Sequence, residues 1–259
     1  ISRYAFYGCT GVISVNIPKS VSFIGDNAFY GCTSLKSVNM EENTNKSFKT
    51  EIDSAAFMNC TSLKSISFPS NVTKLGESVL NGCTNLENVS IPSSVTEIGS
   101  YAFGNCTSLE NLTLPEGVQK LGIQIIKNTI IESITIPKTV TYSSWDVYDS
   151  DGALSGDQFL KEVAFEEGTE LIPSHICSKA SNIEKVTIPS SVTKIDSYAF
   201  YGCTELISVN IPKGVNLIED NAFNGCTSLK SVNMEENTKK LFKTEIDSAA
   251  FMNCTSLKS

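Results

Sequence analysis

The cysteines of this 259-residue chain recur at a fixed interval. They stand at positions 9, 32, 60, 83, 106, 177, 203, 226 and 254, and four of the gaps between neighbours are 23 residues long. Two further gaps are 28 residues long, which is the same interval with five residues added. A period of roughly 20 to 50 residues is typical of chains built from small stacked units. The interval therefore constrains the fold more than any single motif does.

One complete unit covers residues 98–120 and reads IGSYAFGNCTSLENLTLPEGVQK. Its Leu-x-x-Val-x-Ile-Pro segment, occupied here by LENLTLP, recurs along the chain. Across the copies of this segment, apolar and polar residues alternate. Many of the apolar residues, such as Val89 and Ile91, are β-branched, which predicts a short strand. Proline then ends the strand, because it cannot donate to a ladder of hydrogen bonds. Phe103 and Cys106 are three residues apart, which suits one inward-facing helical or 3₁₀ turn.

A single unit of this size cannot bury its own hydrophobic face, whereas stacked copies cover one another. We expect about eleven such units in one domain over residues 1–259. The predicted fold is an α/β solenoid, a right-handed superhelix with a parallel β-sheet on one face. Short helical turns and loops are expected on the other face.

The full pattern is Leu-x-x-Val-x-Ile-Pro-x-x-Val-x-x-Ile-Gly-x-x-Ala-Phe-x-x-Cys, and it recurs over nearly the whole chain. It resembles the BspA-like leucine-rich repeats of bacterial and some protozoan surface proteins. The resemblance implies an extracellular location at the cell surface. It also implies a role in adhesion or binding, with a host or microbial surface protein or a glycan as the partner.

A second level of repetition joins the two ends of the chain. Residues 1–65 and 195–259 align without gaps and differ at 11 positions. A block of units was therefore copied whole after the unit itself had multiplied. Both ends of the chain interrupt the unit, so we expect a fragment of a longer protein. Solenoids need polar capping units, and without them we expect apolar edges that allow end-to-end self-association.

The largest irregularity is an insertion at residues 141–159. Alanine follows proline by ten positions in a regular unit, but Pro137 and Ala153 are sixteen apart. Insertions in solenoids form loops that often carry binding, and Trp and Tyr are favoured anchors in interfaces. The candidate ligand-binding residues in this loop are Tyr142, Trp145, Asp146, Tyr148 and Asp149. The alternative is a surface loop whose aromatic residues pack back on the solenoid.

Strand alternation also predicts which residues leave the core. The expected exposed columns of the sheet are almost entirely small, neutral and polar, with neither an acid–base pair nor a row of aromatic residues. Their character changes at Glu162, Ala164 and Lys185, near the irregular loop. We therefore add Glu162 and Lys185 to the candidate ligand-binding residues.

Several classes of chemistry are disfavoured by the sequence. A net charge of −8 argues against a nucleic-acid partner, because binding to phosphates depends on Lys and Arg. The chain lacks the long apolar run of a membrane span. The cysteines lie too far apart for a zinc motif, and we expect buried free thiols, with an occasional disulfide left open. Asp157 occupies a cysteine position, where we expect the insertion to open it to water.

His175 and Cys177 lie close enough in sequence to form a nucleophilic pair, but Cys177 occupies a position that holds phenylalanine in regular units. A weak calcium site in residues 149–157 stays open, although the spacing departs from a calcium loop. We expect no catalytic residue, no cofactor and no metal. The leading hypothesis is a non-enzymatic binding or adhesion module. The alternative is a structural spacer of a larger surface protein with no ligand of its own.

Overall fold

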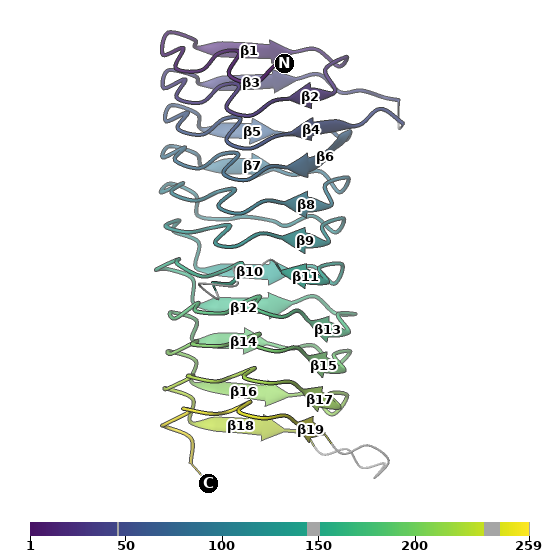
Figure 1. Ribbon diagram of the computed structural model, residues 1–259, viewed down its shortest axis with the longest axis vertical. Coiled ribbons are helices and arrows are strands. Elements are labelled where there is room, and N and C mark those ends of the chain that lie inside the picture. The colour runs from purple at the N-terminus through teal and green to yellow at the C-terminus, as the bar shows by residue number, and fades with distance from the viewer. Residues whose placement is uncertain (46, 144–150, 236–243, 259) are drawn as a thin grey trace.

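The computed structural model describes residues 1–45, 47–143, 151–235 and 244–258. The chain winds into a tall stack of rungs with the N-terminus at one end and the C-terminus at the other (Figure 1). Within a rung, a strand from the Leu-x-x-Val-x-Ile segment is followed by a turn and by a shorter strand that runs back. Strands in successive rungs pair in parallel, as the repeat predicts. The structure is a parallel β-solenoid.

The first face of the solenoid is formed by the Leu-x-x-Val-x-Ile strands. They are β1 (Ser14–Ile17), β3 (Ser37–Met40), β5 (Ser65–Ser67), β7 (Asn88–Ser90), β10 (Ser133–Ile136), β12 (Glu162–Phe165), β14 (Lys185–Thr187), β16 (Ser208–Ile211) and β18 (Ser231–Met234). These strands form three separate sheets, ordered β1-β3, β5-β7 and β10-β12-β14-β16-β18.

The second face is formed by shorter strands that follow the proline turns. They are β2 (Phe23–Ile24), β4 (Thr50–Ile52), β6 (Val72–Leu75), β8 (Glu97–Ile98), β9 (Lys120–Leu121), β11 (Tyr142–Ser143), β13 (Leu171–Ile172), β15 (Lys194–Ile195), β17 (Leu217–Ile218) and β19 (Glu245–Ile246). They form two sheets, ordered β11-β9-β8-β6-β4-β2 and β13-β15-β17-β19. Strands on both faces make this a β-solenoid.

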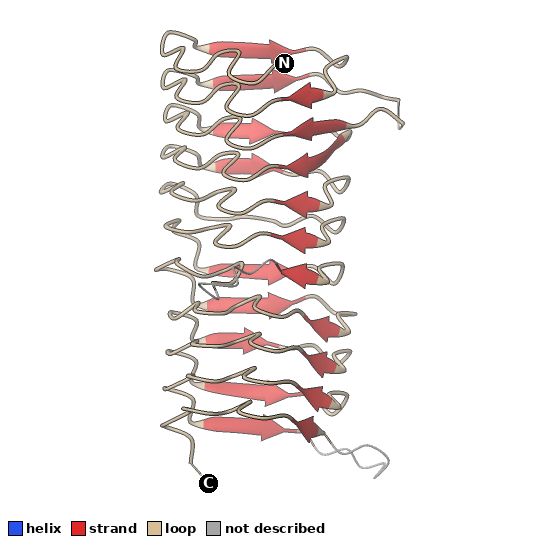
Figure 2. Ribbon diagram, viewed as in Figure 1, coloured by secondary structure: helices blue, strands red, loops and turns tan. Residues whose placement is uncertain are grey.

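The prediction of helical turns is wrong. The described residues form strands, turns and loops and no helix, and thus none suited to crossing a membrane (Figure 2). In the unit at 98–120, the amides of Tyr101, Phe103 and Asn105 donate to carbonyls of the next rung at 2.7–2.9 Å. Tyr101 and Asn105 adopt left-handed φ values of 56° and 57°, which a right-handed helix cannot contain. The spacing of Phe103 and Cys106 therefore reflects a series of turns whose backbone is hydrogen-bonded to the next rung.

The core runs through the stack as columns of equivalent residues, and in many rungs the residue in a column is the same. Phe29 and Phe57 stack with ring centroids 5.2 Å apart, and Phe223 and Phe251 repeat the arrangement at 5.1 Å. Each cysteine beside these rings points its thiol at a backbone carbonyl of the preceding rung. The Sγ of Cys106, for example, lies 3.2 Å from the carbonyl oxygen of Leu80. Cysteine therefore fills its position as a small apolar group with one weak donor.

All nine cysteines are free, as expected, and seven of them are buried. Burial raises the pKa of Cys106 to about 12 and the pKa of Cys83 well above its ordinary value. The thiolate is the reactive form of cysteine. Both side chains therefore resist modification for two reasons: they are buried, and they stay protonated.

Labelling of the folded protein with a thiol reagent at neutral pH should modify only the half-buried Cys9 and Cys254. The other seven thiols should react only as denaturant unfolds the stack. Mass spectrometry of the labelled peptides measures this directly. Equal labelling rates for Cys83 and Cys254 in the native state would contradict the buried column.

The expectation that Asp157 meets water is wrong. The residue is only 4% exposed, and its carboxylate accepts four hydrogen bonds of 2.7–2.9 Å. Two come from the amide and hydroxyl of Thr129, which fills the cysteine position of the preceding rung. The other two come from the amides of Phe159 and Leu160. The burial of this charge is tolerated because every donor around it is aimed at the carboxylate.

Replacing Asp157 with Asn should lower the free energy of unfolding by about 2 kcal/mol, because an amide group would face backbone N–H donors. The exposed Asp220 provides the matched control, and Asp220→Asn should stay within about 0.5 kcal/mol of the parent. Urea unfolding followed by circular dichroism gives both values. Equal stability of the two variants would overturn the account of Asp157.

The two ends of the stack differ from its interior. Phe6 is 39% exposed, whereas Phe200, its counterpart in the duplicated block, is fully buried against neighbouring rungs. Ile246 is 47% exposed, whereas its counterpart Ile52 is fully buried. End-to-end self-association through such faces stays a prediction.

Candidate functional site

The predicted binding residues do not form one site in the described part of the chain. Trp145, Asp146, Tyr148 and Asp149 lie outside the described residues. Tyr142 belongs to β11 on the second face, where its side chain is 49% exposed. Glu162 and Lys185 belong to β12 and β14 on the first face, so the structure separates them from Tyr142.

On the second face, Tyr142 stands at the end of a column of alternating charge. The register places Glu51, Lys74, Glu97, Lys120 and Tyr142 side by side in successive rungs. Lys74 and Glu97 form an ion pair at 3.4 Å, and the column borders a hollow of about 650 Å³.

A row of three glycines lies beside these charges, at points where successive rungs approach closely. A Cβ atom on Gly76, Gly99 or Gly122 would overlap the backbone of the preceding rung. Glycine is thus required there for packing, because only hydrogen fits between the two backbones. These glycines are structural residues even though they line the hollow.

The first face carries the predicted polar columns in register. Asn210 pairs with Asn233, and their side-chain amides are joined by a hydrogen bond of 2.9 Å. The neighbouring column continues across three strands as Ser133, Glu162 and Lys185. Because the residues alternate along each strand, one set faces the core and the other forms a broad polar surface.

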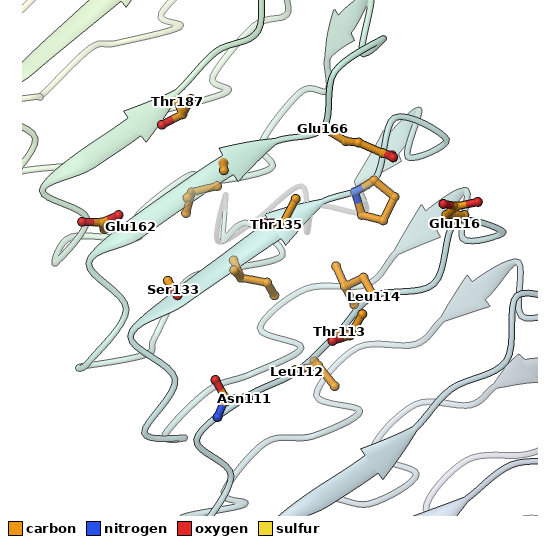
Figure 3. A pocket seen from close by; sticks show the side chains of 14 residues that line it. Asn111, Leu112, Thr113, Leu114, Glu116, Ser133, Thr135, Glu162, Glu166 and Thr187 are labelled. Atoms are coloured by element: carbon orange, nitrogen blue, oxygen red, sulfur yellow. The ribbon is translucent and has the colours of Figure 1, made fainter.

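Glu162 and Lys185 meet across the strand pair, with Lys185 Nζ 3.2 Å from Glu162 Oε2. Both side chains are more than half exposed, at 55% and 62%. Glu162 also lines a hollow of about 500 Å³ on the first face (Figure 3). One predicted residue, Glu162, therefore lies on a wall of this hollow, and its role in binding stays a prediction.

The opposite wall of the hollow is residues 111–114, which run between the sheet that ends at β7 and the sheet that begins at β10. These residues carry the repeat pattern but form no strand, and their backbones make no hydrogen bond to the backbone of any described residue. We call this interruption the seam. Figure 3 shows Leu112, Thr113 and Leu114 along it, facing Ser133 and Thr135 of β10.

The seam is closed at both of its ends. At one end the amide of Ile130 donates to the carbonyl of Leu109 at 3.2 Å. At the other end the hydroxyl of Thr139 lies 2.7 Å from the carbonyl oxygens of Glu116 and Val118. The interruption is therefore an opening bounded at both ends, and inward-facing Leu112 and Leu114 line it.

One feature of the sequence marks the seam. The first inward position of the strand is Val or Ile in the other units, but it is Leu112 here. Leucine lacks the branched Cβ that favours extended strands. This single departure is too weak to have predicted an opening by itself.

The described residues do not support a catalytic pair at His175 and Cys177. Burial raises the pKa of Cys177 well above its ordinary value, so its sulfur stays a thiol. Burial also lowers the pKa of His175, whose ring stacks on Tyr198 at 4.9 Å. Both residues act as packed core residues. Within the described ranges, no group of three or more His, Cys, Asp or Glu side chains is placed to hold a metal ion.

A family model for the BspA type leucine rich repeat region, six copies long, matches residues 1–50, 44–155 and 150–258. These segments span nearly the whole sequence. The chain belongs to the BspA type leucine rich repeat family. The resemblance carried by the repeat pattern is thereby confirmed.

Several solved structures of repeat proteins are similar to this chain. A leucine-rich repeat protein from Eubacterium ventriosum ATCC 27560 is 22% identical with a TM-score of 0.51, over 100% of this chain and 81% of that chain. A leucine-rich repeat protein from Bacteroides ovatus ATCC 8483 is 26% identical with a TM-score of 0.45, over 100% and 81%. The pneumococcal vaccine antigen PcpA is 23% identical with a TM-score of 0.47, over 100% and 72%. The first likeness supports the fold. Curated proteins yield no match.

Exchanging Lys185 for Met should change the free energy of unfolding by no more than about 0.5 kcal/mol, because exposed ion pairs are screened by water. Lys194 is the matched control, since it pairs with Asp196 at 2.9 Å and Glu219 at 2.6 Å and is less exposed. Lys194→Met should cost more, about 1 kcal/mol. Urea denaturation measures both. If Lys185→Met lowered the free energy of unfolding more than Lys194→Met does, the ion pair with Glu162 would contribute to stability, contrary to this prediction.

Proposed function

We propose that this chain is a non-enzymatic binding module at a cell surface, and that its first face binds a protein or glycan partner. Membership of the BspA type repeat family supports this proposal, because such repeats are generally found in surface proteins with binding roles. The buried, protonated thiols and the packed His175 support a role without catalysis.

One observation carries the proposal. The first face holds aligned columns of hydroxyl and amide side chains, and the hollow at the seam interrupts them. Thr113, Thr135 and Thr187 surround this hollow and are exposed. Such groups can donate and accept hydrogen bonds with either sugar hydroxyls or peptide amides. A hollow gives a ligand more contact area than a flat sheet does.

The loop at 141–159 remains part of the proposal on sequence grounds. Tyr142 is exposed beside the charged column of the second face, so an aromatic contact there is available to a partner. Trp145 and Tyr148 are the other proposed anchors, with Asp146 and Asp149 as polar contacts. Tyr142 lies on the second face, whereas Glu162 and Lys185 lie on the first.

A spacer role is the alternative, and the block duplication favours it. Ser14 and Asn16 of β1 recur as Ser208 and Asn210 of β16, so copying the block lengthens the stack and repeats the polar columns of the first face. A spacer needs length and stability and does not need a ligand. The two functions make different predictions for the first face.

The test uses a glycan array and a panel of extracellular-matrix proteins, probed with the 259-residue chain. The double variant Thr113→Arg, Thr187→Arg should lower binding of a ligand found in this way at least about tenfold, because bulky charges would fill the hollow. Thr96→Arg, Thr193→Arg is the matched control on exposed threonines outside this hollow, and it should bind as the parent does.

Trp145→Ala and Tyr148→Ala test the loop in the same assay. Loss of binding in these variants alone would move the site to the loop. Absence of any ligand across the panel would favour the spacer. Equal loss of binding in both arginine variants would count against the first face as the binding surface.

A further inference from the structure

The hollow at the seam continues along the strand direction into a second one. The first has a volume of about 500 Å³ and the second about 430 Å³, and both are lined by Asn111 and Ser133. The second hollow also contacts Glu110, Ile130 and Glu132, which lie just before the seam in the two rungs. Together the two hollows make a groove between residues 110–116 and 130–137, which we call the seam groove. It follows roughly seven residues, or about 20 Å of extended chain.

The backbone along this groove is incompletely paired. Residues 111–114 make no backbone hydrogen bond to any described residue, and β10 pairs only with β12, on the side away from the seam. Nearly all buried backbone donors and acceptors in folded proteins find partners. Leu112 and Leu114 are only 7% and 5% exposed, whereas Asn111 and Thr113 between and beside them are exposed, so the unpaired segment has one buried and one solvent-facing side. An extended chain in the groove would supply the missing partners, as in strand addition to a sheet edge.

The rim of the groove is acidic. Glu110, Glu116 and Glu132 are exposed and form no ion pair with any residue in the described ranges. Glu162 and Glu166 also border the groove, but each is paired, with Lys185 at 3.2 Å and Lys138 at 3.7 Å. The unpaired charge is therefore negative and lies at both ends of the seam.

An exposed aromatic side chain completes the groove. Phe159 is 48% exposed and lines its second hollow beside Ile130. It is held in place by the hydrogen bond from its own amide to the carboxylate of Asp157, at 2.8 Å. The groove thus offers apolar contact at one end, unpaired backbone along its length and carboxylates at its rim.

We propose that the seam groove binds an extended, lysine- or arginine-rich segment of a partner protein. The peptide backbone pairs with residues 111–114, and its cationic side chains reach Glu110, Glu116 and Glu132. This inference rests on the proposed binding function and names the class of partner. The same carboxylates would repel an anionic chain, and a neutral glycan would form no ion pair with them.

The probe is a fluorescein-labelled peptide of alternating lysine and threonine, seven residues long to match the groove. Fluorescence anisotropy should show saturable binding to the 259-residue chain at low ionic strength, weaker at physiological ionic strength because salt screens the carboxylates. The corresponding glutamate–threonine peptide should not bind. A lysine–threonine peptide with alternate N-methylated amides should bind about tenfold more weakly, because it has lost backbone donors while keeping its charge.

The triple variant Glu110→Gln, Glu116→Gln, Glu132→Gln should weaken binding of the lysine peptide at least about tenfold. The matched control Glu77→Gln, Glu170→Gln, Glu205→Gln removes the same charge from other exposed positions and should bind as the parent does. Thermal unfolding of all three proteins checks that the stack is intact. Binding that falls equally in both variants, or that is unaffected by N-methylation, would overturn the proposal.

The outcomes separate this inference from the proposed function. If an array ligand still depends on Thr113 and Thr187 while the lysine peptide fails to bind, the choice of a cationic peptide is wrong and the first face remains a binding surface. If a neutral glycan binds and the Gln variants bind it normally, the groove takes sugars and the inference is likewise overturned. If the arginine variant at Thr113 and Thr187 affects no ligand, the first face fails as the proposed binding surface.

Discussion

The structure depends on hydrogen bonds that pass from one rung to the next. Along the turns, every second amide donates to the neighbouring rung, as Phe103 does to Ile125. The intervening amides close short turns within their own rung, as Gly104 does to Tyr101. No unit satisfies its backbone alone, and none buries its own apolar face, so order in one rung depends on its neighbours. Sideways bonding also explains the absence of helices from the described turns, because a helix would consume the same amides internally.

Because the rungs depend on these bonds, the places where strands of neighbouring rungs do not pair differ most from the rest of the surface. The first face is broken twice, between β3 and β5 and again between β7 and β10. The first break follows the five-residue addition and is bordered by a small, neutral hollow that includes Ser37 and Ser65. The second break has no addition before it and is bordered by carboxylates. A repeat that is chemically uniform thus acquires a distinctive surface where residues 111–114 of one rung form no backbone hydrogen bond with the neighbouring rungs.

Much of the fold was predictable because a residue's position within the unit fixes its environment. The strand segments, the in-register polar columns and the free thiols all follow from the alternation and the period. The turns did not follow, since Tyr101 and His175 adopt left-handed φ that their side chains do not signal. Asp157 was mistaken because its partner Thr129 lies a full rung away in sequence. The seam could not be predicted, because residues 111–114 carry nearly the same residue types as the paired strands of other units. The sequence did select Glu162 on one wall, but not residues 111–114 opposite.

The duplicated block has a consequence for how such a chain can change its length. Residues 1–65 and 195–259 occupy the same phase of the repeat, with β1 and β16, and β3 and β18, in corresponding positions. Unequal crossover between the two copies would remove or add a stretch of 194 residues. Every rung at the new junction would meet a neighbour of nearly the same sequence as before. Recombination can therefore produce proteins with shorter or longer stacks, and no new contact between rungs has to evolve.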